Sequence, residues 1–140
     1  MKIAFVAVAA FLSCSPLATA QMERTVYQSF EIDSVQTITL DIVGDYEVNV
    51  WAGNSILTET NIQIWKASPH LLDYFIEEGR YEIVATTTPS SATLSSKNPT
   101  RKPIKTKTDE CTEIVTLKIF VPDTFQPVSP NDKKTLRKNG

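Results

Sequence analysis

The sequence predicts an all-β domain with one short α-helix, in which a twisted sheet forms a β-sandwich or the start of a β-solenoid. Apolar and polar residues alternate with a period of two along most of the chain, which is typical of half-buried strands. Only the segment around residue 70 has the spacing of an amphipathic helix. The length of 140 residues and the hydrophobic content of 41% suit one globular domain.

The first twenty residues have the pattern of a secretory signal peptide. Lys2 precedes an apolar run over residues 3–12, and residues 18–20 (Ala-Thr-Ala) provide a small-x-small cleavage site. Such a peptide would direct export to the periplasm or the cell exterior and be removed by cleavage after Ala20. Cys14 supports an alternative, a lipoprotein in which a lipid on this cysteine tethers the chain to a membrane surface. No apolar run is long enough to cross a bilayer, so we expect no transmembrane segment in the mature chain.

We predict a single β-rich domain over residues 21–125 and a mobile basic tail over residues 126–140, because the tail has almost no apolar periodicity. Turn residues separate the strands at 44–45 and 52–55. The last strand is the most apolar, and we expect it to be central and covered on both faces. In chain order, the predicted strands are 27–33, 37–42, 46–51, 58–64, 80–87, 92–96 and 113–121.

Residues 68–79 carry the signals of the one helix. Ser68 is a typical N-cap, Pro69 occupies the first helical position, and Gly79 follows the end. Four apolar side chains between them form one stripe, so we expect this helix to pack on the sheet.

Charge is distributed unevenly along the chain. Residues 21–96 contain three basic and eleven acidic side chains, whereas residues 97–140 contain ten basic and five acidic ones. Prolines keep the start of the second region extended, so that its side chains project. One hypothesis is that these cations bind an anionic envelope polysaccharide or another envelope protein. The alternative is a solvated loop beside an acidic sheet. The candidate contacts are Arg101, Lys102, Lys105 and Lys107.

Residues that support catalysis or cofactor binding are scarce. The chain has one histidine, His70, and cleavage would leave one cysteine, Cys111, whose acidic neighbours raise a thiol pKa. No hydrolase triad, zinc cluster or phosphate loop is recognisable, so we expect no enzyme, no metal and no cofactor. The basic segment lacks aromatic residues, so we expect no nucleic acid. A carboxylate-based hydrolase using Asp41, Asp45 and Glu47 is the remaining enzymatic hypothesis.

Two segments carry a resemblance to a known family. Residues 38–54 read ITLDIVGDYEVNVWAGN, a strand, a Gly-Asp turn, a second strand and a Trp-x-Gly-x turn, and residues 119–123 read IFVPD. Over Phe30 to Phe125 the chain resembles bacterial adhesin-like domains of unknown function, of the autotransporter-adhesin head type. Family members usually continue into Gly- and Asn-rich repeats, so we expect a short member.

The resemblance implies repetitive β-structure and an exported envelope protein with a non-enzymatic structural or adhesion-like role. It supplies no catalytic residue to this chain. A binding module for an anionic envelope polymer or a partner protein is the alternative function.

Overall fold

The computed structural model describes residues 21–107 and 109–139, so the predicted signal peptide and Cys14 lie outside the described residues. The described chain is mostly β-structure with one short helix, which confirms the predicted fold class. The elements in chain order are β1 (Met22–Glu31), β2 (Thr37–Asp41), β3 (Tyr46–Trp51), β4 (Ser55–Trp65), α1 (Pro69–Glu77), β5 (Ile83–Thr87), β6 (Ser91–Ser96), β7 (Thr112–Pro122), β8 (Phe125–Ser129) and β9 (Asp132–Lys138).

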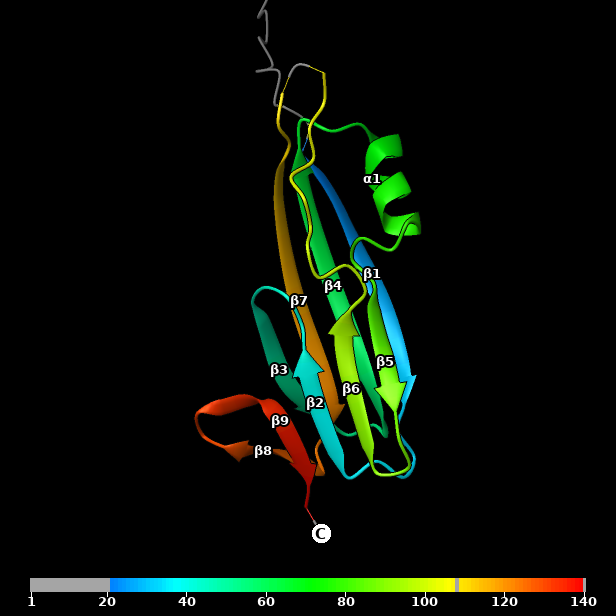
Figure 1. Cartoon of the computed structure of the whole chain (residues 1–140), viewed down its shortest axis with the longest axis vertical. Coiled ribbons are helices and arrows are strands. Elements are labelled where there is room, and N and C mark those ends of the chain that lie inside the picture. The colour runs from blue at the N-terminus through cyan, green and yellow to red at the C-terminus, as the bar shows by residue number, and fades with distance from the viewer. Residues whose placement is uncertain (1–20, 108, 140) are drawn as a thin grey trace, which may run out of the picture.

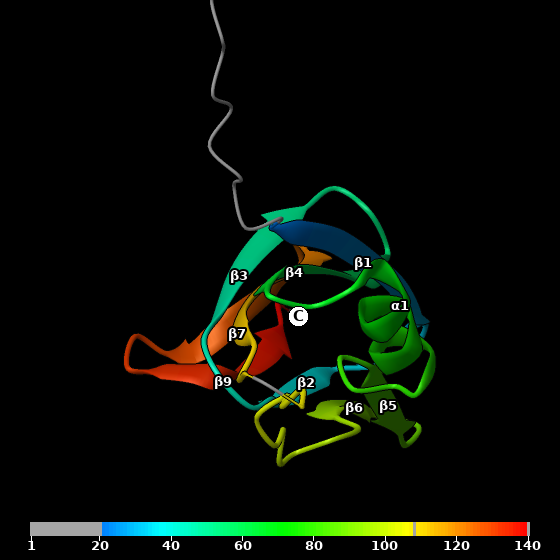
Figure 2. The same ribbon diagram turned by 90° about the horizontal axis from the view of Figure 1, so that it is seen from above.

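The strands form two mixed sheets that face each other as a sandwich, and Figure 2 shows the two layers from above. One sheet has the strand order β1-β4-β7-β3 and the other the order β5-β6-β2-β9-β8. The pairs β2–β6 and β3–β7 are parallel, and the other pairs are antiparallel. Of the two predicted architectures, the structure agrees with the sandwich.

Alternating apolar residues of both sheets fill the space between them. Ile38 and Leu40 of β2 pair in parallel with Ala92 and Leu94 of β6, and all four side chains are buried. Ile119 contributes to the same core from β7 in the opposite sheet. The alternation therefore places one residue in two inside, as expected for a strand with one wet face.

The prediction for the last apolar strand is right about its position and wrong about its outer face. β7 lies between β4 and β3 and is central in its sheet. Its odd-numbered residues Leu117, Ile119 and Val121 are buried, but Ile114 on the other face is 48% exposed. α1 packs on the opposite, inner side of this sheet, the side on which β5 and β6 lie (Figure 2).

The helix forms where the capping signals predict it. The Ser68 side chain accepts a hydrogen bond from the Leu71 backbone amide at 3.2 Å, and Gly79 follows the helix with a φ of 79°. The helix packs Leu72 into a second apolar cluster with Ile62 and Ile64 of β4. That cluster extends the core beyond the upper end of the second sheet (Figure 1).

The C-terminal residues correct the predicted mobile tail. Residues 126–138 lie in the β8–β9 hairpin, and Thr37–Thr39 of β2 pair with Thr135–Arg137 of β9. Leu136 is 2% exposed in the main core, so the second sheet is incomplete without β9. Bonding to β2 compensates for a segment with little apolar periodicity of its own.

The ends of two strands differ from the predicted bounds. The strand predicted to start at residue 80 begins at Ile83, because the Glu82 amide donates to the Gly79 carbonyl in a turn after α1. The first strand starts earlier than predicted, at Met22, because β4 is long enough to pair with it there. Between β6 and β7, one isolated bridge joins Lys105 to Glu110.

One side chain joins the two sheets at the edge where β1 meets β5. The Gln28 Nε2 donates to the Ile83 carbonyl at 2.9 Å, and its Oε1 accepts from the Ile83 amide at 3.0 Å. A side-chain amide thereby bonds a β5 residue as a neighbouring strand would.

Candidate functional site

The four cationic candidates lie on the segment that connects β6 to β7, which runs upward beside the first sheet in Figure 1. We call residues 97–107 the basic loop. Lys102, Lys105 and Lys107 are exposed, whereas Arg101 is partly buried. The structure therefore places the three lysines on the surface and brings Arg101 back toward the body of the domain.

Three contacts fix the backbone of the basic loop. The Arg80 Nη2 donates to the Lys102 carbonyl at 2.8 Å, and the Lys97 amide donates to the Glu82 carbonyl at 2.9 Å. Ile104 is 5% exposed in the cluster beneath α1, and its carbonyl accepts from the Cys111 amide at 2.8 Å. Because the backbone is anchored while the lysines remain exposed, the loop presents charge from a defined conformation.

The arginine that holds the loop belongs to a buried ion pair. Arg80 is 8% exposed, and its Nε and Nη2 each lie 3.0 Å from a carboxylate oxygen of Glu113 at the start of β7. The Tyr81 hydroxyl donates to the same carboxylate. The guanidinium also lies 5.2 Å from the centre of the Phe75 ring.

These partners set the ionisation of the carboxylate. Burial pushes the pKa of Glu113 upward, but the hydrogen bonds from Arg80 and Tyr81, with the charges of Arg80 and Arg101, hold it below its ordinary value. Burial, followed by the bond to Glu113, raises the pKa of Tyr81. Glu113 is therefore an ionised, hydrogen-bonded structural group, which is a poor general base.

Arg101 lies beside this network at a small cavity between the two apolar clusters. Its guanidinium carbon is 5.9 Å from the centre of the Tyr81 ring, and a side chain at Gly44 would meet its Nη2 at 3.6 Å. The cavity has a volume of about 40 Å³. Its polar lining includes Thr60, Glu82, Ser96, Asn98 and Arg101.

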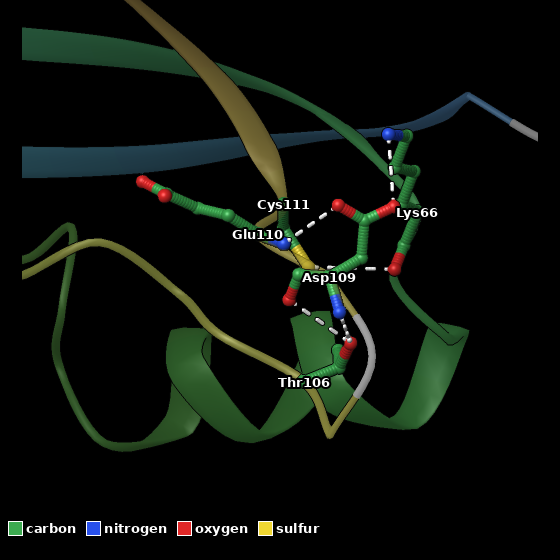
Figure 3. A network of polar contacts seen from close by, with 5 residues as sticks. All are labelled: Lys66, Thr106, Asp109, Glu110 and Cys111. Carbon is green, nitrogen blue, oxygen red and sulfur yellow. Dashed lines mark hydrogen bonds and ion pairs between the residues drawn. The ribbon is translucent and has the colours of Figure 1, made fainter.

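A second polar network holds the far end of the connection (Figure 3). The Lys66 ammonium pairs with the Asp109 carboxylate at 2.9 Å, and Asp109 exchanges hydrogen bonds with Thr106. The Cys111 thiol donates to the Lys66 carbonyl at 3.4 Å. The Lys66 hydrogen bond lowers the pKa of Asp109, while burial and then Asp109 raise the pKa of Cys111. The thiol is therefore poorly suited to act as a nucleophile, in agreement with its acidic neighbours.

The carboxylates considered for a hydrolase do not form a pocket. Asp41 ends β2 in one sheet, Glu47 lies on β3 in the other, and Asp45 lies in the turn between them; all three are exposed. His70 is also exposed, in the first turn of α1. Within residues 21–107 and 109–139, no group of three or more metal-ligating side chains occurs. No helix in this part of the chain has the length and apolar character needed to cross a membrane.

Sequence reasoning missed Arg80 and Glu113, although one signal was present. Glu113 has the same parity in its strand as Val115, Leu117 and Ile119, so the alternation itself places this carboxylate on the inner face. A charge on that face requires a partner.

Comparisons of the chain with protein-family models, curated proteins and solved structures found no match.

Proposed function

We propose that the chain is a non-enzymatic, exported protein of the cell envelope that binds an anionic envelope polymer through the basic loop. The observation that carries the proposal is the conformation of this loop, in which the backbone is anchored by Arg80 and Ile104 while its lysines face solvent. The adhesion-like role implied by the family resemblance would follow from the same binding.

The electrostatics of the loop favour an anionic partner. Lys97 is paired with Glu82 at 2.9 Å, but within the described residues no ion pair reaches Lys102, Lys105 or Lys107. Their attraction for an anion is therefore available to a partner. Each contact between exposed charges is worth only about 0–1 kcal/mol, so binding requires a polymer that engages several cations at once.

A salt series tests this function. The purified protein is assayed for binding to polygalacturonate at low and high ionic strength, and compared with a variant carrying Lys102→Glu, Lys105→Glu and Lys107→Glu. We expect salt-sensitive binding that this variant loses, because screening over about 8 Å at physiological ionic strength weakens exposed ion pairs.

The matched control reverses three exposed cations elsewhere on the molecule, Lys133, Lys134 and Arg137 of β9. Its change in net charge equals that of the loop variant. Retained binding by the control supports a localised contact surface. Equal losses in the two variants would mean that the polymer responds to net charge alone, and the proposed function would be abandoned.

The proposed export and cleavage of the signal peptide are tested by a separate measurement. The intact mass of the secreted protein should correspond to a chain that begins at Gln21. A lipid-modified Cys14 in the isolated product would instead assign the protein to a membrane surface.

A further inference from the structure

The cavity beside Arg101 contains a buried polar atom without a partner. Thr60 of β4 is 3% exposed, and its Oγ1 has no hydrogen-bond partner within the described residues. Thr60 lines the cavity together with Arg101, Ser96 and Asn98. A buried hydroxyl normally finds a partner, so this side of the cavity favours a polar occupant.

The size of the cavity limits what can enter. A water molecule requires about 10–15 Å³ on the same measure, so a volume of about 40 Å³ accommodates about three non-hydrogen atoms. A carboxylate group has three such atoms in one plane. A sulfate or phosphate monoester carries at least four in its charged group, arranged tetrahedrally.

The polar lining suits an anion. The Ser96 Oγ already accepts from the Val43 amide at 3.0 Å, so its own proton is available for donation. Asn98 carries amide protons, and Arg101 carries a planar set of donors that matches a carboxylate.

Nearby negative charges are largely balanced. Glu113 is bonded by Arg80 and Tyr81, and Glu82 is paired with Lys97 at 2.9 Å. Asp45 also lines the cavity, but it is exposed. Arg101, in contrast, forms no ion pair within the described part of the chain.

We infer that this cavity receives a carboxylate group of the bound polymer, held by Arg101 with Thr60 and Ser96, and that it makes the protein prefer polyuronates over sulfated polymers. This inference rests on the proposed function and names its substrate class. The exposed lysines supply general attraction to anions, whereas the cavity supplies discrimination between them.

The test compares two polymers of similar chain length, polygalacturonate and dextran sulfate, at one ionic strength. Wild type should bind the polyuronate more tightly. Arg101→Lys keeps the charge but removes the planar donor pair, so we expect about a tenfold loss of affinity for polygalacturonate and a change of less than about threefold for dextran sulfate. An equal change for both polymers, or no preference in wild type, overturns the inference.

A pair of threonine variants provides a control for packing. Thr60→Val removes the hydroxyl that lines the cavity. Thr58→Val makes the same change two residues away on β4, where the side chain is 1% exposed and also lacks a partner but does not line the cavity. We expect weaker polygalacturonate binding for Thr60→Val alone, and equal effects of the two variants would contradict the inference.

Titration with galacturonate monomer distinguishes the failure of this inference from that of the proposed function. Amide chemical shifts of Ser96 and Asn98 should change in wild type, and Arg101→Lys should require about tenfold more monomer for the same change. Polymer binding without these changes would refute the cavity assignment and leave the basic loop as the site. Monomer binding at the cavity without polymer binding would refute the proposed function instead.

Discussion

Removal of the Glu113 charge should destabilise the fold far more than removal of a similar charge at the surface. Glu113→Gln leaves the Arg80 guanidinium, which is 8% exposed, without its negative partner. Breaking a buried pair by removing one partner costs about 3–5 kcal/mol, because the remaining charge stays desolvated. A domain is stable by only about 5–15 kcal/mol, so the loss is a large fraction of the total.

Glu82→Gln is the matched control. Glu82 pairs with Lys97 at 2.9 Å, close to the 3.0 Å of the Arg80–Glu113 pair, but its side chain and that of Lys97 are 41% and 52% exposed. Exposed pairs contribute about 0–1 kcal/mol, so the control should unfold almost as wild type does. Urea denaturation followed by tryptophan fluorescence measures both variants.

The pH dependence of the free energy of unfolding tests the same prediction in a second way. The folded-state pKa of Glu113 lies below its ordinary value, so its stabilising contribution is complete above the unfolded-state pKa of about 4.3 and disappears as pH falls through the folded-state value. The difference between wild type and Glu113→Gln should therefore shrink in acid. A double variant, Arg80→Met with Glu113→Leu, should recover much of the lost stability. Equal losses for Glu113→Gln and Glu82→Gln, constant across pH, would refute the reasoning.

Two further predictions concern the core. Ile119→Ala, at a fully buried position of β7, should cost about 2–5 kcal/mol in urea denaturation, whereas Thr116→Ala on the exposed face of the same strand should cost less than about 1 kcal/mol; similar costs would mean that the strand faces are assigned wrongly. Leu136→Ala in β9 should also cost about 2–5 kcal/mol, with Lys134→Ala as the exposed control, and a negligible cost at Leu136 would restore the prediction of a mobile tail.

Local signals predicted the elements that local chemistry determines. The cap at Ser68 and the proline after it determine where α1 begins, and both are visible in the sequence. The alternation over β2 likewise follows from one wet and one buried face. Elements that depend on a distant partner could not be found this way. Pro127 and the adjacent lysines at 133–134 are atypical of strands, so the sequence pattern does not predict the β8–β9 hairpin. The hairpin forms because β9 pairs with the edge of β2.

The candidate site likewise contains residues that local sequence signals identify and residues whose positions depend on distant partners. Composition and proline spacing identified the cations of the basic loop, since exposed charge needs no partner to be recognised. They did not reveal that Arg101 turns inward, because its neighbours Gly44 and Tyr81 belong to other parts of the chain. For Glu113, the alternation of the strand predicts the inward-facing side chain. It does not predict the partner, because Arg80 lies more than thirty residues earlier in the chain.

The side-chain bridge from Gln28 to Ile83 has a consequence for self-association. β1 is a ten-residue strand at the margin of its sheet, and such a margin can recruit a second chain into an intermolecular sheet. Gln28 connects its lower part to β5, and near its upper part Arg24 pairs with Asp73 of α1 at 3.6 Å. A second chain approaching this strand would meet both side-chain contacts. These two contacts therefore hinder sheet-to-sheet association of two copies along β1.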